Sequence, residues 1–443
     1  MAAAVPVNSS AQHERRAGIA LASRRDDLID ISLRPDADAS FGAGGELPFE
    51  DRTVHSLSLG DDVVALSVRD QVQLMLECRR VLRPGGTLAL VEPRAQELRS
   101  VLTRWASLVG LIALPGNTTG CGWMKCRPRV TAEPLVSILM PSSNPRYFLE
   151  SLDSAIGQTY GNCEIIICDD SKGEEIAAIV ASRAVRVDIH YVRNPERLQA
   201  RKNFEKCLLL ARGEYVKFLN DDDVLEPDCV ATLLGAFQRT PDLTLATSHR
   251  WRIDANSIVL DDMPATRPAV DLDVVINGVS LANAVIMYGL NFIGEPSTAL
   301  FRRSDLDMKS AQDDPRPFQF NGEEVRGAID LAIWSRLLVQ GNAAFFLRRL
   351  SRFRIHEEQA QARPEVVARS IVGIRGLQRQ WIDLGLFRRF PPHFLLCQPL
   401  ARGDLAPSEW SLAPLRFLAP PNVPPRDALA AWRAIKRHAF DHA

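Results

Sequence analysis

The chain has 443 residues, 46% of them hydrophobic, which is enough for about two or three domains with sizeable cores. Its 53 Lys and Arg residues balance 54 Asp and Glu residues, so the net charge of −1 excludes the strongly basic footprint of a nucleic-acid-binding protein. The 8 cysteines are scattered, without a CxxC pair or zinc-ligand spacing, and a reduced, cytoplasmic compartment is the simplest interpretation.

The N-terminal third of the chain predicts a tail followed by a small α/β segment. Residues 1–27 are rich in Ala, Ser and Arg and contain no unbroken apolar stretch, which predicts a disordered tail rather than a signal peptide. Residues 28–130 alternate strand and helix signals, which predicts a parallel sheet. We expect strands at 28–31, 63–66 and 87–91, and a helix at 72–82.

A second strand–helix alternation follows a linker at residues 127–134. We expect strands at 136–140 (ended by Pro141), 164–168, 187–192 and 215–219, and helices at 147–156, 176–183 and 203–211. Asp170 and Asp222 come after two of these strands. Ligands of open α/β sheets bind at the carboxyl ends of the strands, so both side chains would lie beside a ligand.

The acidic run Asp221-Asp222-Asp223 is the most informative stretch of the sequence. Two unit charges about 4 Å apart repel by roughly 4 kcal/mol at an effective dielectric of about 20, so the run needs either bulk water or a shared cation. Oxygen ligands at this density suit Mg²⁺ or Mn²⁺ held jointly with a phosphate. A solvated acidic turn, with Asp223 capping the next segment, is the alternative.

The C-terminal residues 361–443 are Arg-rich and predict a helical extension. Within it, residues 412–425 are Pro-rich and are expected to be extended, and residues 427–440 predict an amphipathic helix. That helix would pack on the main domain or lie against a membrane. The longest apolar run of the whole chain, Ala106–Leu114, is too short to cross a bilayer, so we expect a soluble protein and leave peripheral membrane contact open.

Six segments of the second α/β unit occur together in one order: Val136–Pro141, Ser154–Tyr160, Glu164–Ser171, Ala211–Tyr215, Phe218–Pro227 and Trp334–Leu337. Through them, residues 135 to about 360 resemble glycosyltransferase family 2, inverting enzymes with the GT-A fold. The resemblance implies an α/β fold of the GT-A nucleotide-diphospho-sugar transferase type at 131–360. An N-terminal partial Rossmann-like α/β segment at 28–130 would precede it, and the helical extension at 361–443 would follow.

The resemblance implies a donor site for a UDP-, dTDP- or GDP-sugar. Asp170 would accept a hydrogen bond from the ring N–H of a uracil- or thymine-like base, although a turn-forming role is the alternative. Asp222 would be the principal ligand of Mn²⁺ or Mg²⁺, and the family motif usually begins with Asp where this chain has Asn220. The other residues implied for nucleotide-sugar or metal binding are Pro141, Ser142, Asp169, Asn203, Asp221, Asp223 and His356.

The resemblance also implies an acceptor side. Asp330 aligns with the catalytic base, and a helix N-cap role is compatible with that. Glu295 lies where the family shapes its acceptor subsite, and a simple turn is the alternative. His356 ends an alternating Arg352-Arg354-His356 pattern that equally fits a surface basic strand. Gln199 replaces a glycine that is common in this family loop.

Residues 47–51 and 79–86 resemble the second half of a class I S-adenosylmethionine-dependent methyltransferase, but the glycine-rich first loop is missing. We therefore interpret 28–130 as a degenerate segment. The expected function is sugar transfer to a saccharide or lipid-linked acceptor in polysaccharide or glycoconjugate biosynthesis, in the cytoplasm or at the inner face of the membrane. A bifunctional methyltransferase/glycosyltransferase, a nucleotidyltransferase and a noncatalytic nucleotide-sugar-binding scaffold are the alternatives.

Overall fold

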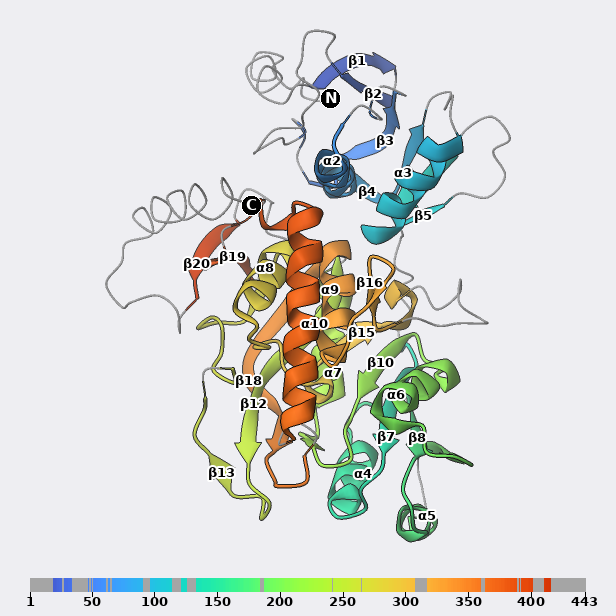
Figure 1. Ribbon diagram of the computed structural model, residues 1–443, viewed down its shortest axis with the longest axis vertical. Coiled ribbons are helices and arrows are strands. Elements are labelled where there is room, and N and C mark those ends of the chain that lie inside the picture. Colours follow the sequence, from blue (N-terminus) through green and yellow to red (C-terminus); the bar gives the residue numbers. More distant parts are fainter. Residues whose placement is uncertain are drawn as a thin grey trace. The chain divides into compact units, whose positions relative to one another are not determined.

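The chain divides into two compact units, residues 1–129 with 379–389 and residues 130–378 with 390–443 (Figure 1). Each unit has its own sheet. The computed structural model describes the whole chain except residues 1–18, 26–27, 34–46, 48, 50, 61–62, 64–65, 91–95, 114–120, 126–132, 184–186, 241, 264, 307–316, 360–362, 389, 391, 401–409 and 416–443.

The first unit contains a mixed six-stranded sheet. Its order is β1 (Ile19–Arg25), β2 (Leu28–Leu33), β3 (Val54–Leu59), β4 (Leu82–Leu90), β6 (Cys121–Lys125) and β5 (Leu111–Ala113), with helices α2 (Val68–Val81) and α3 (Gln96–Leu108). Only β2, β3 and β4 are mutually parallel, and β1, β5 and β6 pair antiparallel. The fully parallel, Rossmann-like segment that the sequence suggested is therefore not confirmed.

The strands expected at 28–31 and 87–91 and the helix expected at 72–82 are confirmed as parts of β2, β4 and α2. The strand expected at 63–66 is wrong. Val63 and Leu66, the two residues of this run that the structure describes, lie outside any strand; Leu66 N–H donates to the Val63 carbonyl at 3.2 Å, and both side chains are buried. The strand of this region is β3.

The second unit is built on a twelve-stranded sheet. Along the sheet the strands are β20 (Ser411–Pro414), β19 (Phe394–Pro399), β14 (Val274–Ile276), β18 (Asn342–Arg354), β12 (Leu243–Ile253), β15 (Leu300–Arg302), β10 (Tyr215–Phe218), β7 (Val136–Ser142), β8 (Cys163–Asp169) and β9 (Asp188–Arg193). β11 (Val224–Leu225) pairs with β18, and β13 (Val259–Leu260) pairs with β12. Every residue of β7 and β8 is buried, as expected for central parallel strands.

The helices of this unit are α4 (Phe148–Ile156), α5 (Glu175–Ala181), α6 (Gln199–Leu210), α7 (Cys229–Arg239), α8 (Gly278–Tyr288), α9 (Ile329–Gln340) and most of α10 (Pro364–Asp383). Short pieces complete it: η2 (Pro296–Thr298), η3 (Arg303–Leu306), β16 (Gln319–Phe320) and β17 (Glu323–Glu324); η5 (Leu386–Arg388) belongs to the first unit. The strands and helices expected between 136 and 219 are confirmed. Pro141 does not end β7, because the pairing with β8 continues to Ser142.

The extension after residue 361 is only partly helical. α10 confirms a helix, but β19 and β20 then pair with each other, and β19 pairs with β14, so this segment extends the main sheet. The extended segment expected at 412–425 begins in β20, and residues 416–425, with the amphipathic helix expected at 427–440, lie outside the described residues. Among the described helices, none is long and apolar enough to cross a membrane.

The strand order reverses at β7, and the candidate site lies at this reversal. β8 and β9 lie on one side of β7 and β10 lies on the other, all four parallel. Such a reversal leaves a crevice at the carboxyl ends of the strands. The segments that follow β7, β8 and β10 are Ser143-Asn144, Asp170 and Asn220–Asp223. Asp170 and the acidic run, both expected to bind the donor, therefore follow parallel strands at the same end of the sheet.

Candidate active site

Asp170 lies at the base of the crevice and is 4% exposed. Its Oδ1 accepts from Leu198 N–H at 2.7 Å and from the Asn194 side chain at 2.9 Å, and its Oδ2 accepts from Gln199 N–H at 2.9 Å. Leu198 and Gln199 begin α6, where a carboxylate is favourable. Asp170 therefore holds the start of α6, and since a carboxylate offers about four acceptor positions, its contact with a base stays a prediction.

Asp169 and Asn203, which lie near Asp170, make contacts that hold neighbouring elements of the fold together. Asp169 is fully buried and accepts from the Tyr191 hydroxyl at 2.7 Å and from Ser171 N–H at 2.8 Å. Asn203 lies one turn inside α6 rather than at its start, so it is not a helix cap. Its Nδ2 donates to the Cys168 carbonyl at 2.8 Å, which ties the helix to β8.

The departure at Gln199 has a backbone consequence. Its φ of 62° lies in the left-handed region, where a glycine costs least. The chain therefore keeps the backbone path of a glycine although the residue is Gln. Gln199 N–H donates to Asp170, and this hydrogen bond offsets part of the backbone strain at Gln199.

The loop after β7 is organised by Asp221. Its Oδ2 accepts from Ser143 N–H at 2.6 Å and from Asn144 N–H at 2.8 Å. Ser142, expected to touch the donor, is fully buried and its hydroxyl donates to the Met140 carbonyl, and Pro141 is buried in the same strand. The side chains of these two predicted residues are buried because β7 continues through both of them, further than the sequence suggested.

The three consecutive aspartates point in different directions. Asp223 is 1% exposed; its Oδ2 accepts from the Ser297 hydroxyl at 2.6 Å and from Asn220 Nδ2 at 3.0 Å, and its Oδ1 accepts from Arg354 N–H at 3.1 Å. All its visible partners are donors of the protein, so the expected role of Asp223 as a metal ligand is not supported. The same contact explains Asn220, because an amide can donate to Asp223 where a second carboxylate would repel it.

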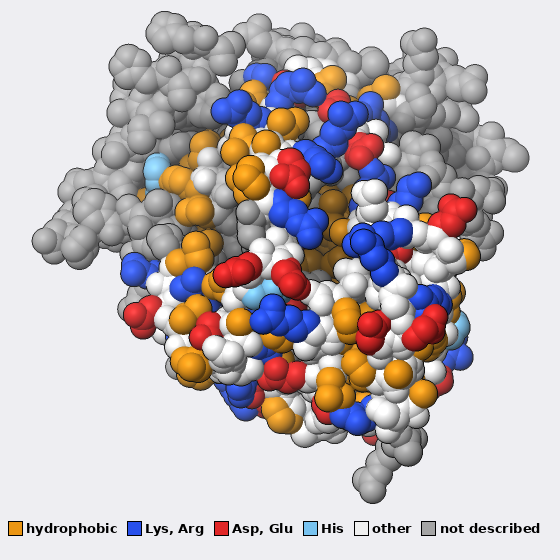
Figure 2. All heavy atoms as spheres, turned by 60° about the horizontal axis from the view of Figure 1, so that its bottom comes forward, with side chains coloured by type: hydrophobic (Ala, Val, Ile, Leu, Met, Phe, Trp, Pro, Cys, Tyr) orange, Lys and Arg blue, Asp and Glu red, His pale blue; other side chains and the backbone are white. Residues whose placement is uncertain are grey.

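Asp222 is the member of the run that faces His356. Its Oδ2 lies 3.1 Å from His356 Nε2, with the two side chains 19% and 3% exposed. Burial, together with the charge of Asp221, raises the pKa of Asp222 to about 7. Burial lowers the pKa of His356, which favours the neutral imidazole. Figure 2 shows a His side chain among Asp, Glu and Lys or Arg side chains on the face at the bottom of Figure 1.

Arg354 fixes this arrangement from β18. It is almost fully buried, and its Nε donates to the Asp222 carbonyl at 2.9 Å while its N–H bonds Asp223. Its guanidinium stacks over the Tyr147 ring at 4.4 Å and pairs with Glu150. The surface basic strand that the alternating pattern allowed is therefore wrong at Arg354 and His356, both of which are buried against the acidic run.

The donor set at Asp222 and His356 fits a divalent cation that is shared with a ligand. One carboxylate oxygen and one imidazole nitrogen face each other, and burial, with the charge of Asp221, raises the pKa of Asp222, so a bound cation would favour its charged form. Among the described residues, no cluster of three or more His, Cys, Asp or Glu side chains could hold a metal ion alone. Phosphate oxygens and water would have to complete the coordination.

Asp330 lies in the first turn of α9, two residues after the N-cap Ala328, so it is not itself the cap. Its Oδ2 accepts from Asn291 Nδ2 at 2.6 Å and its Oδ1 from Leu331 N–H at 2.9 Å. Burial first, and then the charge of Glu295, raises the pKa of Asp330 to about 6. A carboxylate with a pKa near the working pH is suited to accept a proton.

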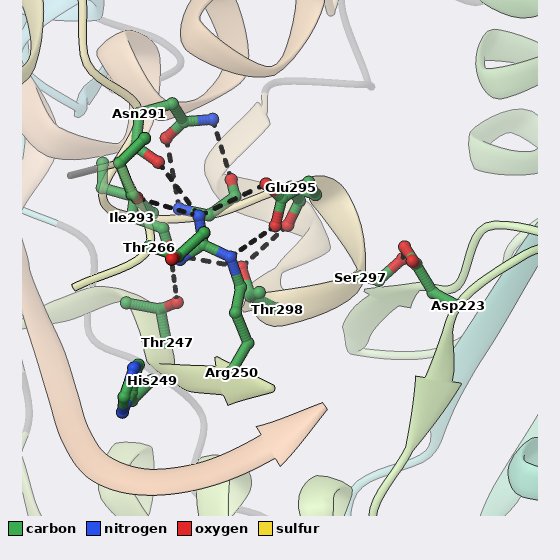
Figure 3. Close-up of polar contacts among 12 residues, drawn as sticks. Asp223, Thr247, His249, Arg250, Thr266, Asn291, Ile293, Glu295, Ser297 and Thr298 are labelled. Carbon is green, nitrogen blue, oxygen red and sulfur yellow. Dashed lines mark hydrogen bonds and ion pairs between the residues drawn. The ribbon is translucent and has the colours of Figure 1, made fainter. Parts of the chain in front are cut away.

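Glu295 is paired with an arginine that the sequence did not single out. Arg250, in β12, is 1% exposed and places its Nε 2.6 Å from Glu295 Oε2 and its Nη2 3.3 Å from Oε1. Figure 3 shows Arg250 reaching toward Glu295, and Ser297 turned toward Asp223. Glu295 starts η2 through its extended backbone, so the turn alternative and a ligand role are compatible.

Sequence reasoning missed Asn291, Arg250 and Ser297. Each acts on a residue more than 35 positions away in the chain, and a single Asn, Arg or Ser carries no local pattern. Of these three residues, only Ser297 lies next to a recognisable sequence motif, the Gly294-Glu295-Pro296 turn. The structure thus unites Asp222 with His356 on one side and Asp330 with Glu295 on the other.

Residues 137–307 match the model of the family described as Glycosyl transferase family 2. An uncharacterized protein of Mycobacterium tuberculosis is 29% identical over 229 residues, which cover 50% of this chain and 67% of the relative. Chondroitin synthase of Escherichia coli is 35% identical over 121 residues, 26% of this chain but only 16% of the synthase. Hyaluronan synthase of Pasteurella multocida is 32% identical over 131 residues, 28% of this chain and 13% of that protein.

Among solved structures, S. aureus TarS 1–349 in complex with UDP-GlcNAc superposes with a TM-score of 0.42 and 14% identity, covering 57% of this chain and 71% of that one. The family match begins at residue 137, and the methyltransferase resemblance of residues 28–130 finds no support. The matches cover only 16% and 13% of the two synthases, so the activities in their names belong to those proteins.

Proposed function

We propose, from the glycosyl transferase family 2 domain that residues 137–307 form, that this protein is an inverting glycosyltransferase that uses a UDP-, dTDP- or GDP-sugar and a divalent cation. The observation that carries the proposal is Asp330, a carboxylate of raised pKa held in the same unit as the Asp222–His356 pair. One side of the site would hold the departing diphosphate, and the other would take up the acceptor's proton.

Asp222 and His356 would hold Mn²⁺ or Mg²⁺ together with the donor diphosphate. The cation would supply positive charge for the leaving group as the sugar–phosphate bond breaks. Asp221 contributes indirectly, because it fixes the Ser143-Asn144 backbone at the edge of the crevice. Arg354 keeps Asp222 in place through its backbone carbonyl.

Asp330 would act as the general base. Its ionised carboxylate takes the proton from the acceptor hydroxyl, the hydroxyl oxygen forms a bond to the anomeric carbon, and the bond from that carbon to the diphosphate oxygen breaks. The nucleoside diphosphate leaves with the electron pair. A single displacement of this kind inverts the configuration, and Glu295 beside the base would bind a hydroxyl of the acceptor.

The acceptor class is proposed from the relatives. Two of them are named chondroitin synthase and hyaluronan synthase, which supports a saccharide or lipid-linked acceptor in polysaccharide or glycoconjugate biosynthesis. We propose a cytoplasmic location, with the inner face of the membrane as a further setting. S-adenosylmethionine chemistry is not proposed for residues 28–130, because nothing in the comparisons supports it.

The test is a screen of UDP-, GDP- and dTDP-sugars, with and without Mn²⁺, by thermal shift and by release of nucleoside diphosphate. We expect one nucleotide class to stabilise the protein in a Mn²⁺-dependent way and to be turned over. Asp222→Asn should abolish both, whereas Leu209→Ala, at an exposed position of α6, should change neither. Nucleotide binding without any turnover would favour the noncatalytic scaffold, and no binding would refute the proposal.

A further inference from the structure

One short segment, Asn291–Thr298, contacts both halves of the site. At its C-terminal end, the Ser297 hydroxyl donates to Asp223 Oδ2 at 2.6 Å and accepts from Asn220 N–H at 3.0 Å. At its N-terminal end, Asn291 Nδ2 donates to Asp330 Oδ2 at 2.6 Å. We call Asn291–Thr298 the bridging segment, because it connects the acidic run after β10 with the carboxylate on α9.

The bridging segment turns tightly at Gly294. Gly294 has φ +114°, and a Cβ at this position would overlap the Thr298 side chain. Its N–H donates to Asn291 Oδ1 at 3.2 Å, and its carbonyl accepts from Asn291 Nδ2 at 2.9 Å and Trp334 Nε1 at 3.3 Å. The Asn291 amide therefore uses both donors and its acceptor, closing the turn and holding Asp330 at once.

Buried side chains hold the segment against the sheet (Figure 3). Thr247 of β12 donates to the Ile293 carbonyl at 2.7 Å, and Arg250 Nη2 lies 3.4 Å from the Asn291 carbonyl as well as pairing with Glu295. Buried Lys217 of β10 donates to the Ser297 carbonyl. Both ends of the segment are thus fixed to strands, and it cannot shift at one end without breaking these contacts.

We propose that Asn291 and Ser297 are positioning residues at the two ends of a rigid spacer, Asn291 aiming the base Asp330 and Ser297 aiming the acidic run. This inference rests on the proposed function, since it deepens the roles of Asp330 and the donor side. It assigns the two residues different effects: Asn291 governs proton transfer, and Ser297 governs donor binding.

Among the described residues, Glu295 is the charged group with the largest effect on the pKa of Asp330. Glu295 is the carboxylate that acts on it, Arg250 pairs with that Glu295, and the Asn291 and Leu331 hydrogen bonds favour its charged form. Loss of the Asn291 bond should therefore move the acid limb of the kcat profile to higher pH. Asn291→Asp should move it further than Asn291→Ala, because a second carboxylate would then face Asp330.

The experiment compares wild type, Asn291→Ala, Asn291→Asp, Ser297→Ala and a surface control, Asn162→Ala. We expect kcat at pH 6 to fall about tenfold or more in Asn291→Ala and further in Asn291→Asp, with the acid limb displaced upward and the Kd for nucleoside diphosphate with Mn²⁺ unchanged. Ser297→Ala should weaken that Kd and leave the acid limb in place. An unmoved acid limb in both Asn291 variants, or a milder effect of Asn291→Asp than of Asn291→Ala, overturns the inference.

A measurement without turnover separates this inference from the proposed function. In urea unfolding at pH 8, the stability cost of Asn291→Asp should shrink when Asp330 is replaced by Asn, because the facing charge is then removed. An equal cost in both backgrounds refutes the contact between Asn291 and Asp330. If that coupling is present while no donor is turned over, the proposed function fails and the positional link stands.

Discussion

The two sides of the site are held by different kinds of structure. On the donor side, backbone N–H groups carry much of the acidic run: Asp221 accepts two loop N–H groups, and Asp223 accepts the N–H of Arg354 from β18 in addition to the side chains of Ser297 and Asn220. On the base side, Asp330 depends on the side chain of Asn291 and on one N–H of its own helix. Sheet topology therefore builds the first side, and a few side chains build the second.

On the donor side, the expected role of each aspartate in the acidic run depends on the groups that its side chain faces. Asp222 faces His356, Asp223 faces buried donors and Asp221 faces a loop. The three residues are identical in type and adjacent in sequence, yet each has different partners in the fold. Replacing them one at a time is the sharpest way to test this comparison.

Asp222→Asn should have the largest effect, a loss of activity of about a thousandfold, because it removes the carboxylate that we propose holds the cation of the departing diphosphate. The free energy of unfolding should not fall, since the pKa of Asp222 raised to about 7 shows that its charge is strained in the folded protein. Steady-state kinetics and urea unfolding check both expectations. A normal rate in Asp222→Asn would contradict its assignment.

Asp223→Ala should act on folding rather than directly on chemistry. It would leave the Ser297 hydroxyl, the Asn220 amide and the Arg354 N–H without their buried acceptor, at a cost of about 3 kcal/mol in unfolding free energy. Urea unfolding measures this cost. A stable Asp223→Ala protein that has lost only Mn²⁺ binding would restore Asp223 as a metal ligand.

Asp330→Asn should stabilise the protein at high pH. The folded-state pKa of Asp330, about 6, is above the ordinary value, so the folded protein holds the proton more tightly. The stability that this carboxyl contributes is present below about pH 4 and is lost as the pH rises through about 6. Removing the charge should therefore gain about 3 kcal/mol at pH 8 and nothing at about pH 4 in urea unfolding, and a gain that is independent of pH would contradict the raised pKa.

Asp221→Ala should have the smallest effect, about 1 kcal/mol of unfolding free energy, because water can replace it at the exposed N–H of Ser143. We expect the Kd for nucleoside diphosphate to weaken only moderately as the loop loosens. Thermal unfolding and nucleotide titration of the same samples give both numbers. A loss as large as that of Asp223→Ala would make the backbone contacts of Asp221 more important than this account allows.

The sequence predicted the donor side better than the base side for a physical reason. Strand signals at 136–140, 164–168 and 215–219 place their polar successors at one edge of a sheet, so the sequence alone was enough to group Asp170 with Asp222. Which way each side chain points depends on tertiary partners, so the sequence does not reveal that Ser142 and Asp223 bond to protein groups or that Arg354 is buried. Asn291 and Arg250 act across the fold, and a lone polar residue leaves no periodic signal.

A paired assay of wild type and Asp330→Asn decides whether Asp330 acts as the base. It records nucleoside diphosphate binding with Mn²⁺ and product formation between pH 5 and 8. We expect Asp330→Asn to bind nucleotide like wild type, to lose about a hundredfold or more in turnover and to lack the wild-type decline in rate below about pH 6. Wild-type turnover in Asp330→Asn, or a decline at the same pH in both proteins, would contradict the account.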